Sequence, residues 1–295
     1  MEIANRTMGQ SFILIGFPGG PIHHYLMFSA LLLIFVITLA GNILIIFIIT
    51  TDPLLHTPMY FFLVNMSFLE TCGISSIIPK LLCILIGGKK LISASECYLQ
   101  TIIYFFITSS VFLILAVMSF DRYVAICHPL RYVTIMRHII CVCLLCLCMV
   151  IAFICLMYPI IMISKLPYCG SIINHFFCDI AAVLKLICVE ISFIKLSILI
   201  SSVFILVIPL ILTVYVYKIL IIPSAKGRHK TFSTCVSHLT MVSIVFGSAI
   251  FIQIRPPKDY STETDKVVNL VSTILAPLLN PFIYTLRNQQ VKKSI

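Results

Sequence analysis

The stretch YLMFSALLLIFVITLAGNILIIFII, residues 25–49, decides the class of this protein. It contains no charged side chain, and a helix of this length crosses the roughly 30 Å hydrocarbon layer of a membrane. Of the 295 residues in the whole chain, 61% are hydrophobic and only 10% are charged. A soluble domain carries about half apolar and a quarter charged residues, so the chain is predicted to be a membrane protein.

Further apolar stretches follow, and each is near or above the roughly 20 residues that a helical span needs. They lie near residues 58–86, 98–120, 138–163, 196–222, 232–254 and 267–286. Stretches this apolar fit helices far better than the weak alternating pattern of a membrane barrel. We therefore expect an all-α membrane protein, a bundle of seven transmembrane helices over residues 25–286.

An odd number of crossings puts the two ends of the chain on opposite sides of the membrane. Asn5-Arg6-Thr7 is a glycosylation sequon, which indicates an external N-terminus if Asn5 carries a glycan. Residues 1–24 are then outside the cell and residues 287–295 form a short cytoplasmic tail. Lys and Arg divide almost evenly between the two sides, so charge alone does not decide this topology.

Four cysteines fall on the expected outer side, namely Cys97, Cys169, Cys178 and Cys188. An oxidising exterior favours disulfides among them, and four cysteines allow three pairings. A second group, Cys141, Cys143, Cys146 and Cys148, lies in an apolar span. A helix would spread these thiols around its axis, whereas zinc needs four converging ligands, so no metal site is expected.

Polar residues inside spans are costly, and each suggests a function. Asn42, Glu70 and Asn280 lie in the first, second and seventh spans. Two interpretations remain open: an ion- or proton-binding cluster, or a polar clasp between helices. Arg122 follows Cys97 by about 25 residues, hence ~37 Å of helix, which places it at the inner membrane surface beside Asp121. Pro281 predicts a kink after Asn280.

Catalytic patterns are absent from the sequence: it has no paired carboxylates, His-Glu-x-x-His spacing, phosphate loop or nucleophile elbow. We therefore expect no enzyme activity and no cofactor. The formal net charge of +10 fits basic loops beside a membrane rather than a nucleic-acid partner. His175 and the His23-His24 pair lie near outer boundaries and are expected to be solvated.

Five stretches, in order and at the expected spacing, resemble the olfactory (odorant) receptors of the tetrapod-type class II. The olfactory receptors are a branch of the rhodopsin-like G-protein-coupled receptors. The five stretches are LHTPMYFFL (55–63), MSFDRYVAIC (118–127), HFFCD (175–179), KTFSTCVSHL (230–239) and PLLNPFIYTLRN (277–288). The likeness covers nearly the whole chain. It implies a multi-pass plasma-membrane receptor.

The resemblance also implies roles for particular residues. It pairs Cys97 with Cys178 and Cys169 with Cys188 across the outer loop. It implies that the partner is a stimulatory, olfactory-type heterotrimeric G protein. The loop between the third and fourth spans and the stretch 226–230 would face this G protein. The activation switch would comprise Asp121, Arg122, Tyr123, Asn280, Pro281 and Tyr284. The Ser-Tyr pair that the family carries late in the fifth helix is missing, with Val214-Tyr215 nearest, and Val111 replaces a usual glutamate.

A ligand pocket is expected beside the third span. Phe105, Thr108, Ser109 and Phe112 follow i, i+3, i+4, i+7 spacing and share one helix face. Thr108 lies about 11 residues below Cys97, roughly 17 Å deep. The alternative is ordinary packing, in which Ser and Thr bond their own backbone. The opposite wall is expected to hold Ser201, Phe204, Ile205, Phe246, Ile250 and Gln253.

The upper third span has no carboxylate, so we expect a small, neutral, mostly apolar volatile. Such a ligand would favour the arrangement in which the inner ends of the helices open for the G protein, raising cyclic AMP. The alternatives are a small polytopic transporter or channel, or a non-olfactory, orphan chemoreceptor with impaired signalling. A transporter usually shows internal repeats and broken spans, and the sequence shows neither.

Overall fold

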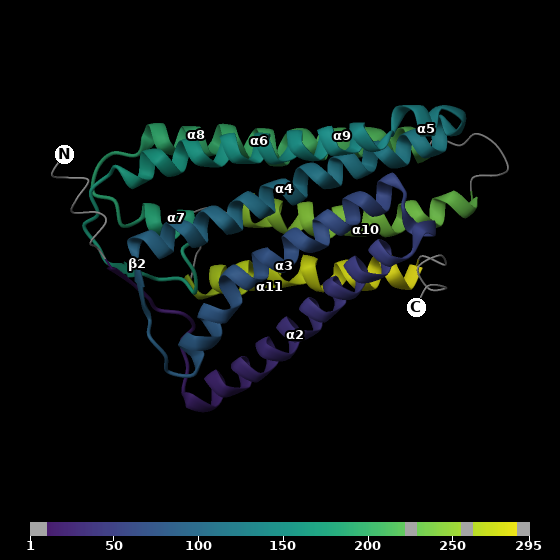
Figure 1. Cartoon of the computed structure of the whole chain (residues 1–295). Helices are drawn as coiled ribbons and strands as arrows, with labels where there is room; N and C mark the ends of the chain where they lie inside the picture. Colours follow the sequence, from purple (N-terminus) through teal and green to yellow (C-terminus); the bar gives the residue numbers. More distant parts are fainter. Residues whose placement is uncertain (1–10, 222–228, 255–261, 288–295) are drawn as a thin grey trace.

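The computed structural model describes residues 11–221, 229–254 and 262–287. Long helices run roughly side by side through these residues (Figure 1). They are α2 (Pro21–Thr51), α3 (Pro58–Leu85), α4 (Ala94–Cys127), α6 (His138–Ser164), α8 (Ser192–Ser202) with η3 (Val203–Val207) and α9 (Ile208–Ile221) as one rod, α10 (His229–Ile254) and α11 (Thr262–Arg287). The expected seven rods are therefore present.

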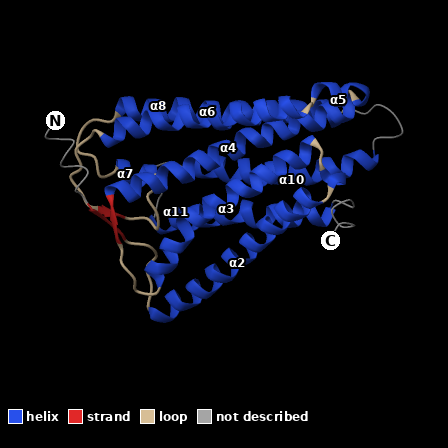
Figure 2. Cartoon of the chain, in the orientation of Figure 1, coloured by secondary structure: helices blue, strands red, loops and turns tan. Residues whose placement is uncertain are grey.

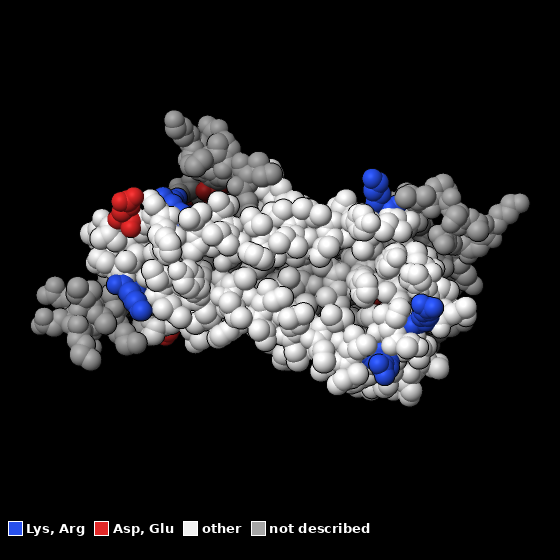
Figure 3. Space-filling model, turned by 90° about the horizontal axis from the view of Figure 1, so that it is seen from above, with Lys and Arg blue, Asp and Glu red and all other residues white. Residues whose placement is uncertain are grey.

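Six of these rods are long and apolar enough to cross a membrane, and α10 contributes the shorter apolar part His238–Phe251 among its described residues. Large apolar side chains such as Leu33 and Phe47 are more than half exposed on the outside of the bundle. On the face that Figure 3 shows, charged side chains gather toward the two ends, and a broad belt without them lies between. The belt fits a lipid environment.

Local sequence explains where the helices begin. Pro21 and Pro58 stand in the first turns of α2 and α3, where a missing backbone N–H costs nothing. At the start of α4, the Ser93 hydroxyl accepts the Glu96 N–H at 3.2 Å, and the Glu96 carboxylate accepts the Ser93 N–H at 2.9 Å. This reciprocal cap starts α4 before residue 98, the expected beginning of the span.

The main core lies where α3 and α4 meet the other helices. Met66, Ile114, Leu115 and Met241 are at most 1% exposed there. On the lipid side the same helices carry exposed apolar residues, because lipid solvates them as well as a protein core does.

A small sheet at one end of the bundle was not expected (Figure 2). Its strand order is β2-β1-β3, with β1 (Ser11–Leu14) antiparallel to β2 (Leu91–Ser93) and parallel to β3 (Ile172–Ile173). Phe12 and Leu14 alternate with exposed neighbours and are at most 1% exposed. The segment before α2 is thereby fastened to the loops between the helices.

The opposite end carries short turns: η1 (Pro53–Leu55), η2 (Pro129–Arg131) and α5 (Tyr132–Ile135). The first described strand and the end of α11 lie at opposite ends of the bundle (Figure 1). This separation is what an odd number of crossings requires.

Candidate functional site

A cavity of about 380 Å³ lies inside the bundle, toward the end that carries the sheet. Its wall is formed by α3, α4, α6, α8 with η3, α10 and α11, and by the short helix α7 (Ile180–Leu184) in the outer loop. The volume is in the range of small-molecule sites, which are mostly apolar with a few placed polar groups.

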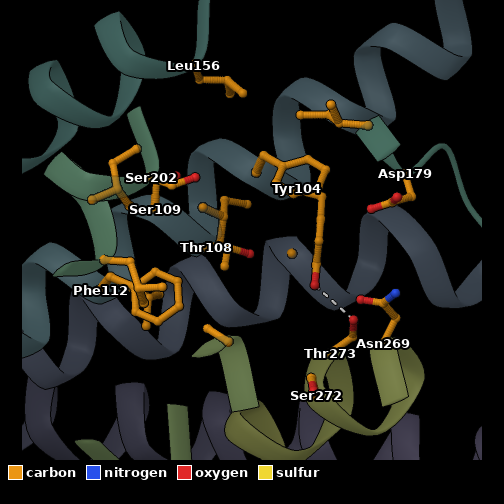
Figure 4. A pocket seen from close by; sticks show the side chains of 18 of the residues that line it. Tyr104, Thr108, Ser109, Phe112, Leu156, Asp179, Ser202, Asn269, Ser272 and Thr273 are labelled. Carbon is orange, nitrogen blue, oxygen red and sulfur yellow. Dashed lines mark hydrogen bonds between the residues drawn. The ribbon is translucent and has the colours of Figure 1, made fainter. Parts of the chain in front are cut away.

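All four residues singled out on the third span, Phe105, Thr108, Ser109 and Phe112, line this cavity. Figure 4 shows Thr108, Ser109 and Phe112 on the cavity side of α4. The Ser109 hydroxyl has no hydrogen-bond partner among the described residues, and the residue is 8% exposed. Its hydroxyl is available to a ligand.

The fifth rod contributes a different set from the one expected. Ser201 and Ile205 line the cavity, but the Ser201 hydroxyl donates to the Cys155 carbonyl at 2.9 Å. Phe204 is wrongly placed by the sequence argument, because it is 53% exposed and does not line the cavity. Residues 203–207 form a π turn, which is wider than an α turn. Ser202 and Leu206 also line the cavity, whereas Phe204 faces lipid.

The sixth rod also differs in detail. Val245, Ser248 and Ala249 of α10 line the cavity. Phe246 lies behind the wall, 1% exposed, with its ring 5.0 Å from that of Phe112. Ile250 packs against the main core and does not line the cavity. The side chain of Gln253 lies outside the described residues.

The cavity wall also has a polar group of residues to which no sequence pattern pointed. It comprises Tyr104, Asp179, Asn269, Ser272 and Thr273. The Tyr104 hydroxyl and Thr273 Oγ1 are 2.9 Å apart, and Figure 4 shows Asp179 and Asn269 beside them, away from Ser109 and Ser202. The cavity therefore has the Ser109 and Ser202 hydroxyls on one side, and a carboxylate, an amide and the Tyr104 and Thr273 hydroxyls on the other.

Asp179 reaches the cavity because the outer loop folds down onto the bundle. Cys178 is disulfide-bonded to Cys97, with their Cα atoms 5.4 Å apart. Its backbone N–H donates to Gln100 Oε1 at 3.0 Å, and its carbonyl accepts from Thr101 Oγ1 at 2.7 Å. Asp179 then caps α7, its Oδ1 accepting two backbone N–H groups at 2.9 and 3.2 Å.

A second disulfide joins Cys169 to Cys188, with Cα atoms 5.6 Å apart. Both disulfides are the pairs that the resemblance implies. A hydrogen bond between the hydroxyls of Tyr98 and Tyr168 adds a link between α4 and this loop. The loop is thereby attached to the bundle at several points.

His175 is not solvated as expected; it is 4% exposed. Its ring packs on Phe176 and Phe177, and its Nε2 lies 3.4 Å from Asn269 Nδ2. Burial lowers the pKa of His175, so the ring is neutral near pH 7. The loop's fold, rather than its composition, buries this histidine.

The segment before α2 also contacts α11. Lys266 of α11 is fully buried and donates to the Gly16 carbonyl at 2.6 Å and to the Glu263 carboxylate at 2.9 Å. Phe17 stacks on Phe176, with ring centroids 5.5 Å apart. No sequence pattern pointed to Lys266, because its partner carbonyl lies 250 residues away.

The polar residues of the first, second and seventh spans meet below the cavity. Asn280 Nδ2 donates to Glu70 Oε2 at 2.7 Å, and Asn42 Nδ2 donates to the Pro277 carbonyl at 2.9 Å. That carbonyl is free because Pro281, four residues on, has no N–H. Asn42 Oδ1, Glu70 Oε1 and Asn280 Oδ1 accept no hydrogen bond from the described residues, so a clasp and a cation or proton site are both compatible with this geometry.

At the other end of α4, the Asp121 carboxylate is fully buried. Its Oδ2 accepts from Arg122 Nη2 at 2.5 Å and Nε at 3.0 Å, and its Oδ1 accepts from the Tyr132 hydroxyl at 2.8 Å. Burial raises the pKa of Tyr132, and the Asp121 charge raises it further, so the hydroxyl remains a donor. Tyr123 contacts His128, and the side chain of Tyr284 lies outside the described residues.

The inward tyrosine of the fifth rod is Tyr217, not Tyr215 of the Val214-Tyr215 pair. Tyr215 is 62% exposed, whereas Tyr217 is 5% exposed and hydrogen-bonds to His238 Nδ1 of α10. The two residues lie on different faces of α9, and only packing decides which face is inside.

No group of three or more metal-ligating side chains occurs among the described residues. Cys141 and Cys148 are buried, whereas Cys143 and Cys146 are exposed, so the four thiols do not converge. Asn5 precedes the first described residue.

Comparison with known proteins covers almost the whole chain. A family profile described as "Olfactory receptor" matches residues 31–295. Olfactory receptor 6X1 of Homo sapiens is 44% identical over 99% of this chain and 95% of its own length. Olfactory receptor 6E1 of Mus musculus is 45% identical over 99% of this chain and 95% of its own length. With the seven-rod bundle and its internal cavity, this likeness makes the chain a multi-pass plasma-membrane receptor of the olfactory receptor family.

Proposed function

We propose that an odorant enters the cavity from outside the cell and that the receptor then activates a stimulatory, olfactory-type heterotrimeric G protein, raising cyclic AMP. Residues 1–24 are outside in this proposal, and the tail 287–295 is inside. The disulfides Cys97–Cys178 and Cys169–Cys188 support this topology, since disulfides persist in oxidising surroundings.

The observation that carries the proposal is the cavity on the Phe105–Phe112 face of α4. Apolar side chains from several helices surround it, and Ser109 and Ser202 present hydroxyls without a hydrogen-bond partner among the described residues. A small volatile with an apolar body and one hydrogen-bonding group fits such a wall. Residues 105, 108, 109, 112, 201, 202 and 205 are proposed as its contacts.

A ligand in the cavity can activate the receptor because several helices line the same cavity. A ligand that contacts α4, η3, α10 and α11 together favours the helix arrangement that fits it best. At the far end of α4, Arg122 is held by Asp121, and α10 is linked to α9 by His238 and Tyr217. Rearrangement of α10 against α4 would free Arg122 to bind the G protein.

The receptor function is tested by ligand-evoked cyclic AMP in transfected cells that display the tagged chain at their surface. A panel of volatiles is expected to raise cyclic AMP, and Arg122→Ala at equal surface display is expected to abolish the rise. A response that survives Arg122→Ala contradicts the switch. Uptake of a volatile or ion without any cyclic AMP response favours the transporter alternative.

The cavity is tested with Ser109→Ala, which removes the side-chain hydroxyl and adds no atom. The response to an alcohol or carbonyl agonist is expected to fall more than the response to a hydrocarbon analogue, by about tenfold in EC50 if one hydrogen bond of ~1.4 kcal/mol is lost. Equal loss for both ligands removes Ser109 from the binding site. Ser197→Ala is the control, because Ser197 does not line the cavity and its hydroxyl donates to the Ile194 carbonyl.

A further inference from the structure

The described wall of the cavity carries two carboxylates, Glu70 and Asp179, and no Lys, Arg or His side chain. Asp and Glu together number only 10 in the whole chain. In a cavity of low dielectric, the field of a carboxylate is stronger than in water. The wall therefore favours positive charge and hydrogen-bond donors over anions.

Asp179 is the carboxylate that a ligand meets. Glu70 lies on the floor, where its Oε2 is already bonded to Asn280. Asp179 uses only Oδ1 to cap α7, and its Oδ2 makes no hydrogen bond among the described residues. Its carboxylate points toward Tyr104 and the interior of the cavity (Figure 4).

Neutral oxygen atoms lie on the same side of the cavity as that carboxylate (Figure 4). Asn269 places its Nδ2 3.4 Å from His175, and its amide oxygen faces the cavity (Figure 4). The Tyr104 and Thr273 oxygens lie 2.9 Å apart on the same side. An ammonium group has three N–H donors and no acceptor, so a carboxylate, an amide oxygen and a hydroxyl oxygen are the partners it needs.

The positive groups near Asp179 that the structure describes do not neutralise it. Lys266 does not line the cavity and is held by Gly16 and Glu263. Lys185 is exposed to solvent. His175 is buried and neutral near pH 7, because desolvation lowers its pKa. Among the described residues, no Lys or Arg forms a salt bridge with Asp179.

We propose that the cavity selects odorants that pair an apolar body with a protonated primary amine, and that the ammonium binds Asp179 with Asn269 and Tyr104 around it. The inference rests on the proposed receptor function and narrows its ligand class. It replaces the neutral volatile expected from the third span alone, because the counter-charge comes from the outer loop. The apolar body then lies along Phe105 and Phe112.

The test compares three head groups on the same apolar bodies: an amine, an alcohol and a carboxylic acid, each on hexyl, cyclohexyl and phenylethyl frames. EC50 for cyclic AMP is measured, together with the shift in melting temperature that each probe causes in the purified receptor. For each apolar frame that activates the receptor, the EC50 of the amine is expected to be at least about tenfold lower than that of the acid. The EC50 of the alcohol is expected to lie between the two. An acid as strong as its matched amine overturns the inference.

Asp179→Asn removes the charge and keeps an N-cap of equal quality, so α7 remains capped. The variant is expected to raise the EC50 of the amine by about tenfold and to leave that of the alcohol within about twofold. Glu190→Gln, in the same loop, removes an exposed carboxylate outside the cavity and is expected to change neither.

Equal loss for amine and alcohol in Asp179→Asn means a structural role and overturns the inference. A receptor that responds to neutral volatiles but to none of the amines also overturns it while leaving the proposed function in place. A receptor that responds to no volatile contradicts the proposed function itself.

Discussion

The Asp121 carboxylate is fully buried, yet it accepts hydrogen bonds from both Arg122 and Tyr132. A buried charge is costly unless it is paired, so these two donors stabilise the arrangement with Arg122 bound. Asp121→Asn weakens this hold on Arg122. Ligand-independent cyclic AMP is expected to rise, because a charged hydrogen bond contributes about 1.5–3 kcal/mol and its loss shifts the closed-to-open ratio about tenfold or more.

Tyr132→Phe removes only one neutral donor and is expected to raise basal cyclic AMP less than Asp121→Asn does. Both variants are compared at equal surface display. Basal signalling equal to wild type in Asp121→Asn would show that this pair does not restrain the receptor.

His175 makes the outer loop sensitive to acid. Burial holds its folded-state pKa below the ordinary value, so the neutral form is favoured in the folded chain. The contribution of His175 to the free energy of unfolding is therefore fully present above the unfolded-state pKa of about 6.5, and it is lost as the pH drops below that value. Of the charges facing His175, Asp179 opposes this shift, whereas Lys266 and Lys185 add to it.

The melting temperature of the purified receptor is expected to fall between about pH 7.5 and pH 5.5, and His175→Gln is expected to lose less over this interval. His56, at the opposite end of the bundle, is exposed and supplies the control variant, His56→Gln, which should fall as wild type does. An identical fall in wild type and His175→Gln would remove His175 as the source.

At the scale of elements, α2 and α11 approach closely at Gly41. A Cβ atom there would lie 3.0 Å from the ring of Pro281. Next to it, Asn42 donates to the carbonyl that Pro281 leaves without a partner. Helices in lipid are usually joined in two ways, and both occur here: a small residue permits close approach, and a polar side chain forms a hydrogen bond to the partner helix.

Gly41→Ala is expected to lower the melting temperature, because the added methyl group meets Pro281. The matched control is Gly247→Ala in α10, where nothing lies within 4 Å. In a helix, Ala is favoured over Gly by about 1 kcal/mol, so the control is expected to be neutral or stabilising. A stabilising Gly41→Ala would contradict the close contact.

Over the whole molecule, the sequence predicts the bundle well because lipid solvates each span separately. Hydropathy therefore reports every rod without reference to its neighbours. The face of α4 with Phe105, Thr108, Ser109 and Phe112 is equally readable, since helical spacing alone puts these residues together. All four line the cavity.

The parts that depend on distant contacts could not be predicted. Apolar residues fill most of the fifth rod, so its sequence does not show that Phe204 faces lipid while Leu206 lines the cavity. Asp179 and His175 lie in a polar loop, and only its disulfide and its hydrogen bonds to α4 bring them to the bundle. The three-stranded sheet joins segments whose strands are too short to stand out in the sequence.

A structure of the receptor with an activating odorant and a stimulatory G protein bound would reveal the ligand site and the Arg122 switch together. Ligand density is expected inside the bundle, touching Thr108 and Ser109, and the Arg122 guanidinium is expected to have left Asp121 for the G protein. Ligand density on the outer surface of the bundle, or Arg122 still bound to Asp121 in that complex, would contradict the proposed function.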